Sequence, residues 1–216
     1  MDRIQYYESL VIKKIKNKNA KIIVFGASEN DLKIFKKLNY KNVTFSNLNI
    51  ENHNTIKINI HQNNLDDGEY DYSITNASIH HSSKPHMSIL EMYRVSREGV
   101  LIIEANDSLL IRAAIKLNFA EEFEISAIKN GSTGVDNTNI PNFIYRWNER
   151  EIYKLLNSYK PDIIHDIKFE YENDVRLSKN MFLGLKIILS IFFLFFKKQQ
   201  NLMSIFINKK NQKKRF

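Results

Sequence analysis

Two adjacent histidines, His80 and His81, are the strongest candidates for chemistry in this sequence. They follow residues 70–75, which we expect to form a strand after the turn signal at residues 66–68. An imidazole titrates near neutral pH, so either ring is suited to removing a proton from a hydroxyl group. The alternative is structural: one histidine packs against a bound molecule or caps the helix expected to begin near Pro85.

A third histidine, His86, raises the question of a metal site. Adjacent side chains are expected to point in different directions, and no Asp or Glu stands at a helical spacing from the pair. The chain contains no cysteine, which excludes thiolate nucleophiles, disulfides and cysteine-ligated metals. The sequence therefore predicts no metal site.

Three further residues are candidates for contacting a substrate. Asp107 follows the most apolar strand expected in the chain, residues 100–103, and would either orient a substrate or cap the next helix. Tyr145 and Arg146 lie in an aromatic segment, residues 142–147, where the guanidinium is suited to a phosphate or carboxylate. The alternative for this segment is a small satellite core.

Expected strands and helices alternate along residues 21–175, after an amphipathic helix within residues 1–20. This alternation predicts an α/β fold, a Rossmann-like doubly wound sheet that is mostly parallel. Residues 129–142 are irregular and are expected to lie over the ligand edge of the sheet. The expected strands are residues 21–25, 42–46, 55–60, 70–75, 100–103 and 163–171.

The first of these strands ends in a turn of small residues, Gly26 and Ala27. Small residues at this place let a ligand approach the main chain. Only one glycine is present, so the dinucleotide fingerprint of an NAD-dependent enzyme is not matched.

Residues 22–31, then 70–81, then 90–95 with 99–104 resemble, in this order, segments of the class I S-adenosylmethionine-dependent methyltransferases, in particular the type 11 family. The resemblance implies S-adenosylmethionine (SAM) as cofactor. The chain departs from the family pattern where Ala27 and Glu29 replace glycines and where Asn47 and Asn49 replace an acidic residue after the second strand. The cofactor-binding positions implied by the resemblance are Gly26, Ala27, Asn47, Asn49, His61, Gln62 and Asn76.

The function expected from this resemblance is methyl transfer to a small-molecule or glycan acceptor, with His80 or His81 as the base. A bacterial role in surface-polysaccharide synthesis at the membrane is the working hypothesis. The alternative is a catalytically degenerate module that keeps the fold for binding or scaffolding.

The net charge of +8 is concentrated at the two ends of the 216-residue chain. Residues 181–196 are almost entirely apolar, yet at about 1.5 Å per residue they span only about 24 Å, less than a bilayer core of about 30 Å. A helix that is apolar on every side must enter a membrane interface, a partner or a groove on its own domain. The preferred interpretation is that residues 176–216 form an apolar and basic helical tail at an anionic membrane surface. The basic residues flank an apolar helix, so no nucleic-acid partner is expected. The N-terminus lacks a secretory signal, which predicts a cytoplasmic protein, peripheral on the inner face of the membrane.

Overall fold

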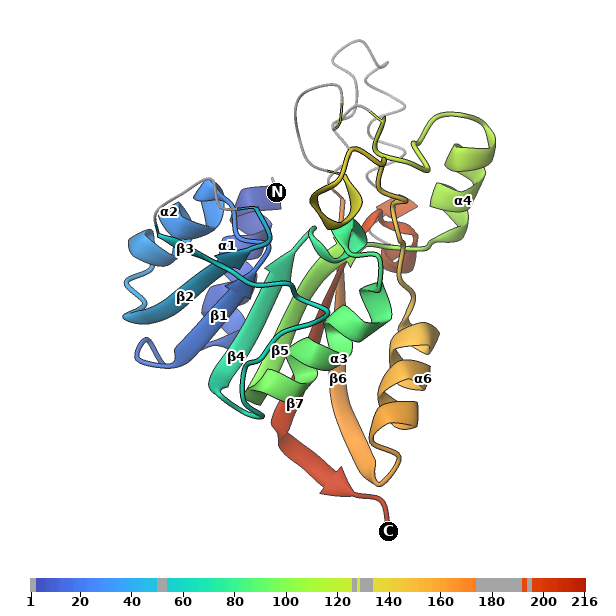
Figure 1. Ribbon diagram of the computed structural model, residues 1–216. Coiled ribbons are helices and arrows are strands. Elements are labelled where there is room, and N and C mark those ends of the chain that lie inside the picture. The colour runs from blue at the N-terminus through green and yellow to red at the C-terminus, as the bar shows by residue number, and fades with distance from the viewer. Residues whose placement is uncertain (1–2, 50–53, 126–127, 129–133, 174–191, 194–195) are drawn as a thin grey trace.

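One seven-stranded sheet organises the chain, with the strand order β3-β2-β1-β4-β5-β7-β6 (Figure 1). The five strands from β3 to β5 pair in parallel, whereas β7 runs antiparallel to both β5 and β6. The predicted Rossmann-like, mostly parallel sheet is confirmed. The strands are β1 (Lys21–Phe25), β2 (Asn42–Asn47), β3 (Thr55–Lys57), β4 (Tyr70–Asn76), β5 (Ser96–Ala105), β6 (Ile163–Glu172) and β7 (Leu202–Lys214). The computed structural model describes residues 3–49, 54–125, 128, 134–173, 192–193 and 196–216.

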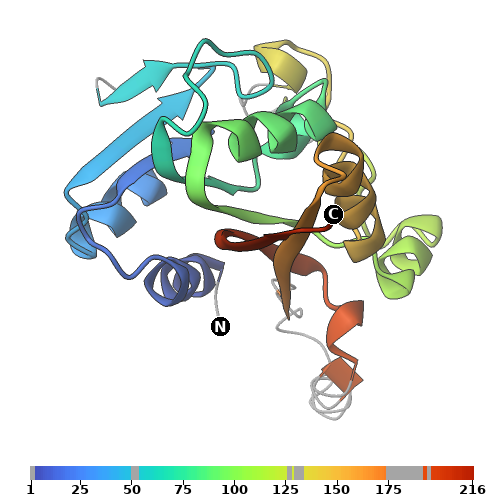
Figure 2. The same cartoon turned by 90° about the horizontal axis from the view of Figure 1, so that it is seen from below.

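Helices cover both faces of this sheet (Figure 2). One face packs against α1 (Arg3–Lys14) and α2 (Glu29–Lys37), and the other against α3 (Pro85–Val95) and α6 (Glu149–Tyr159). The remaining elements are α4 (Leu109–Lys116) and three short 3₁₀ turns, η1 (Ile79–His81), η2 (Val135–Asn137) and η3 (Lys197–Gln199).

The central strand β1 shows why two covered faces are needed. Its side chains alternate between the faces, so that Ile22 and Val24 enter the core under α1 and α2, while Ile23 and Phe25 enter the core under α3. All four are essentially inaccessible to solvent. A continuous apolar run is therefore stable only in a sheet that is buried on both sides.

The end of the chain differs from the sequence-based expectation. Residues 202–214 are not part of a tail: they form β7, which lies between β5 and β6. Leu202 and Phe206 enter one core, and Met203 and Ile205 enter the other, so that the strand joins both layers. The lysines after this apolar run made the segment resemble a basic tail. The expected apolar helix of residues 181–196 falls almost entirely outside the described residues, and among the described helices none has the length and apolarity needed to cross a membrane.

Candidate active site at the carboxyl edge of the sheet

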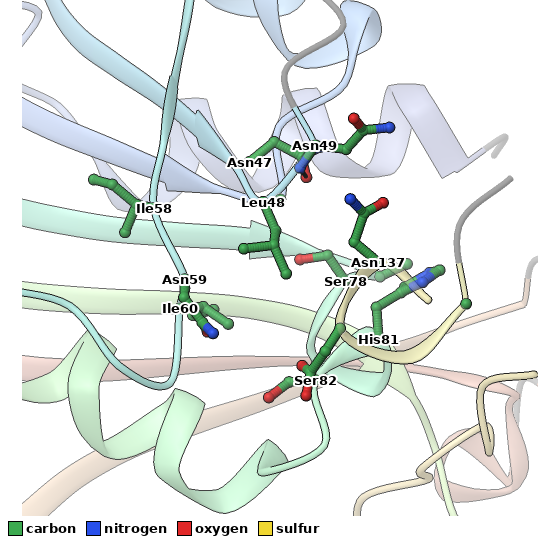
Figure 3. A pocket seen from close by; sticks show the side chains of 14 residues that line it. Asn47, Leu48, Asn49, Ile58, Asn59, Ile60, Ser78, His81, Ser82 and Asn137 are labelled. Carbon is green, nitrogen blue, oxygen red and sulfur yellow. Dashed lines mark hydrogen bonds between the residues drawn. The ribbon is translucent and has the colours of Figure 1, made fainter. Parts of the chain in front are cut away.

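A cavity of about 170 Å³ lies where the carboxyl ends of β1, β2 and β4 meet (Figure 3). The chain order reverses on the two sides of β1, and open α/β sheets bind ligands at this kind of position. Three predicted cofactor-binding residues, Gly26, Asn47 and Asn49, line the cavity. The other lining residues are Leu48, Ile58, Asn59, Ile60, Ala77, Ser78, His81, Ser82, Gly134, Asp136 and Asn137.

Gly26 makes the turn that opens this cavity. Its φ of +63° belongs to the left-handed region, and a Cβ atom at this position would lie 2.1 Å from Ser78 Oγ. The Ser78 hydroxyl donates to Phe25 O at 3.3 Å and lies 2.7 Å from Thr75 Oγ1. Only glycine fits here, because both the backbone conformation and the packing of Ser78 exclude a side chain.

Asn47 fixes the opposite wall of the cavity. Its side-chain amide donates to Ala27 O at 3.1 Å, and its Oδ1 accepts from the backbone N–H of Asn49 at 3.2 Å. Asn47 therefore ties the end of β2 to the glycine turn. Its Oδ1 has a second lone pair, which is available to a ligand hydroxyl.

The remaining predicted cofactor residues are not among the residues that line the cavity. Ala27 and His61 are buried behind it, and the ring of His61 places Nδ1 2.7 Å from Ser82 Oγ. Gln62 is exposed, whereas Asn76 ends β4 and keeps a buried Oδ1 with no hydrogen-bond partner among the described residues. A direct role in cofactor binding remains a prediction for these four.

A second cavity, of about 310 Å³, adjoins the first and contains most of the titratable groups at this edge. His80, His81, Glu104 and Glu124 line it. His81 and Ala77 line both cavities. The side chain of His81 therefore stands at the boundary between the two spaces.

His80 is held between two carboxylates. Its Nδ1 lies 2.9 Å from Oε2 of the fully buried Glu104, whose other oxygen accepts from the backbone N–H of Ile79, and its Nε2 lies 3.6 Å from Glu124 Oε2. Burial lowers the pKa of His80, but Glu104 and Glu124 outweigh this effect and raise the pKa to about 10. The hydrogen bond from His80 in turn lowers the pKa of Glu124 to about 2, against the effect of burial. His80 is thus a cation at neutral pH, which argues against the predicted role of general base for this residue.

His81 faces the same carboxylate as His80. Its Nε2 lies 3.6 Å from Glu124 Oε2, and its Nδ1 lies 2.7 Å from the side-chain nitrogen of Asn142, which also donates to Glu124 at 3.2 Å. The centroids of the His80 and His81 rings are 4.6 Å apart. The expectation that the adjacent histidines point in different directions is wrong, because the turn η1 presents both rings to the segment that carries Glu124.

Glu124 and Asn142 were not identified from the sequence. Both lie in segments without clear periodicity, and neither stands at a telling spacing from the histidines. An isolated antiparallel bridge between Phe123 and Phe143 brings the segment that contains Glu124 next to the segment that contains Asn142. Only tertiary structure could place these two residues beside η1.

The three predicted substrate residues are not among the residues that line these cavities. Asp107 pairs with Arg112, and Ser108 rather than Asp107 caps α4 by accepting from Ile111 N. Arg146 donates to the backbone carbonyls of Glu121 and Ile144, at 2.6 and 3.1 Å. The Tyr145 hydroxyl donates to Glu151 at the end of α6 that faces the carboxyl edge. Contact with a substrate remains a prediction for all three.

The fold is shared with several solved methyltransferase structures. A putative methyltransferase from Bacillus halodurans C-125 matches with a TM-score of 0.54 and 12% identity, over 93% of this chain and 97% of that chain. A SAM-dependent methyltransferase from Archaeoglobus fulgidus matches with a TM-score of 0.56 and 11% identity, over 95% and 94% of the two chains. The plantazolicin methyltransferase in complex with S-adenosylhomocysteine (SAH) matches with a TM-score of 0.54 and 16% identity, over 95% of this chain and 82% of that chain.

No family model matches the chain, and no curated protein matches its sequence. The likeness is therefore one of structure. The chain has the Rossmann-like fold of the class I SAM-dependent methyltransferases.

Proposed function

We propose that this protein transfers a methyl group from SAM to an acceptor bound in the second cavity. The observation that carries the proposal is the meeting of two cavities at His81, on the ligand edge of a methyltransferase fold. Methyl transfer needs two adjoining sites, because the acceptor atom must attack in line with the methyl carbon and the departing sulfur.

The first cavity offers the groups that a nucleoside cofactor requires. Gly26 exposes main chain at the end of β1, Asn47 offers an amide oxygen to a hydroxyl, and Ile58 and Ile60 add an apolar wall suited to a base. These residues would hold SAM. When bound, SAM supplies the electrophilic methyl group, and the protein's task is alignment.

The second cavity contains the groups that would prepare the acceptor. A hydroxyl acceptor must lose its proton as the oxygen–methyl bond forms and the methyl–sulfur bond breaks. His80 is held as a cation by Glu104 and Glu124. We therefore assign direct contact with the acceptor proton to His81, which reaches both cavities.

A membrane-surface acceptor, such as a glycan carried by a lipid, is the finer proposal. The amphipathic helix α4 has no buried residue, and Leu109, Leu117 and Phe119 on and just after it are 69%, 63% and 84% exposed. The start of α4 is hydrogen-bonded through Gln199 to η3, which follows the apolar run of residues 181–196 in the sequence. Exposed apolar groups on a surface helix favour contact with lipid.

The proposed membrane contact is smaller than the tail predicted from the sequence. Lys209 donates to the backbone carbonyls of Tyr93 in α3 and Ser96 in β5, and Lys210 pairs with Glu98, so neither belongs to a free basic tail. Two described lysines lie at this surface: Lys116 in the last turn of α4 and Lys197 at the start of η3, whereas Lys198 pairs with Glu149.

A catalytically degenerate module is the second candidate, and the size of the first cavity favours it. A volume of about 170 Å³ lies below the ~300–1,000 Å³ typical of small-molecule sites. Ser78 fills the space over Gly26, and Asn137 of η2 reaches the cavity from the other side. A whole SAM molecule would require η2 to move outward.

Transfer of label from methyl-tritiated SAM tests the proposed activity. The full chain is incubated with SAM and with lipid-linked glycan, free glycan and small-molecule acceptors in separate arms. We expect label in one acceptor arm, and at least about 100-fold slower transfer by His81→Asn, as is typical when a general base is lost. Absence of transfer in every arm, by a protein that binds SAM, would contradict the acceptor classes proposed.

A further inference from the structure

The two histidines and Glu124 form a compact set of potential metal ligands. One ligand atom from each of His80, His81 and Glu124 lies within 4.8 Å of the other two. Each imidazole Nε2 is 3.6 Å from Glu124 Oε2. Ligand atoms at about 2.0–2.1 Å from a tetrahedral zinc ion lie about 3.3 Å from one another, so small rotations of the side chains would complete the set.

Buried side chains hydrogen-bond to the two histidines in the way that is usual for metal-binding histidines. Metal-bound histidines donate their second ring N–H to a carboxylate or carbonyl, which fixes the ring orientation. His80 makes this contact through Nδ1, 2.9 Å from the fully buried Glu104. Glu104 is itself fixed by the backbone N–H of Ile79.

Asn142 provides the corresponding contact for His81. Its side chain is completely buried, and its Oδ1 has no hydrogen-bond partner among the described residues. The amide nitrogen lies 2.7 Å from His81 Nδ1. Turning this amide over would place Oδ1 against an Nδ1–H group, which is the partner that a metal-bound His81 requires. It would also break the hydrogen bond from Asn142 to Glu124, so the Glu124 carboxylate would have to turn from Asn142 to the ion.

The set leaves room for further ligands. His80, His81 and Glu124 line a cavity of about 310 Å³, which has space for a water molecule beside them. Three protein ligands with an open position are typical of catalytic rather than structural zinc sites. Two imidazoles and one carboxylate suit zinc better than magnesium, which prefers oxygen ligands.

We propose that His80, His81 and Glu124 bind one divalent ion of the zinc class in the second cavity, oriented by Glu104 and Asn142. Metal binding itself does not depend on the proposed function; the role of the ion does. In a methyltransferase the ion would replace His81 as the group that activates the acceptor, because a metal-bound His81 Nε2 cannot also accept a proton. An acceptor hydroxyl at the open position would be made more acidic by the ion and would release its proton to water.

Zinc calorimetry on the full chain, first stripped with a chelator, tests the site. We expect one Zn²⁺ per chain and no comparable binding of Mg²⁺. Glu124→Gln and His81→Asn should each weaken zinc binding by more than ~10–100-fold, the loss that is typical when a residue that only hydrogen-bonds to a metal ligand is replaced. Glu122→Gln, the same change at an exposed neighbour, should bind zinc as the natural chain does. Unchanged binding by Glu124→Gln would overturn the proposal.

A second measurement needs no variant and so does not depend on how a variant folds. In the NMR spectrum of the natural chain, stoichiometric Zn²⁺ should shift the ring signals of His80 and His81 and leave those of His86, which contacts Glu151, in place. A folded chain whose histidine signals ignore zinc would also overturn the proposal. Zinc binding without SAM binding would remove only the proposed function, and SAM binding without zinc binding would remove only the metal site.

Discussion

At the scale of single residues, the site depends on charges that are paired in the protein interior. His80 and Glu104 lie in the same buried contact, with 7% and 0% of their side chains exposed. A buried charge is tolerated when hydrogen bonds and an opposite charge compensate the loss of water. The protonated state of His80 and the position of Glu104 therefore support each other.

The titration of His80 in the metal-free protein is the first prediction. Its pKa is raised from 6.5 to about 10, so the stability gained from this contact is complete below about pH 6.5 and is lost as the pH rises through about 10. NMR of histidine-labelled protein, free of metal, should show His80 protonated throughout pH 6 to 8. Glu104→Gln should move the pKa of His80 down toward 6.5. A His80 signal that titrates near pH 6.5 in the natural chain would contradict the charge assignment.

Replacement of Gly26 is the second prediction. Gly26→Ala adds a Cβ atom at a φ of +63° and within 2.1 Å of Ser78 Oγ, so we expect a loss of about 1–3 kcal/mol or more in the free energy of unfolding. Chemical denaturation measures the loss. The double variant Gly26→Ala with Ser78→Gly removes the clash and should recover part of it, leaving the cost of the backbone conformation. Equal stability of Gly26→Ala and the natural chain would show that the turn is not as described.

At the scale of elements, the strands that are buried on both faces could be predicted from the sequence. The segments that complete the site could not. The continuous apolar runs of β1 and β5 and the alternation with helices predicted the sheet, because burial on two faces leaves a clear pattern. Gly26 and the His80–His81 pair were found because they stand directly after strands. Glu124 and Asn142 were missed because long-range packing, not local periodicity, places them.

The exposed surface of α4 carries the third prediction. Leu117→Glu with Phe119→Glu places charges where the proposed lipid contact lies, and both positions are largely exposed, so stability should change by less than about 0.5 kcal/mol. Co-sedimentation with anionic vesicles should fall at least about tenfold, as expected when two apolar groups leave the interface. Ile56→Glu, an exposed apolar position on β3, serves as the control and should sediment normally. Unchanged sedimentation of the double variant would exclude α4 from the contact.

At the scale of the whole molecule, the fold is closed by its last strand. β7 fills the gap between β5 and β6 and contributes buried residues to both cores. The sequence-based boundary at residue 175 missed this, because a short apolar run followed by lysines is ambiguous until its partners are known. The pairing of β5 and β6 into one sheet therefore depends on residues 202–214.

Removal of β7 is the fourth prediction. A chain that ends at residue 201 should fail to fold, because β5 and β6 would lose their shared neighbour and the cores would open to water. Circular dichroism and thermal unfolding measure this. Removal of Phe216 alone, which is 93% exposed, should leave both unchanged. A cooperative thermal transition in the chain without β7 would contradict the placement of this strand.

Calorimetric titration of the full chain with SAM, with SAH and NAD in parallel, is the most direct test of the proposed function. We predict binding of SAM and SAH with micromolar affinity, at about −8 kcal/mol, and no binding of NAD. Asn47→Leu should weaken both, because it removes the amide that faces the cavity. A folded chain that binds neither SAM nor SAH would contradict the methyltransferase proposal and leave the degenerate module.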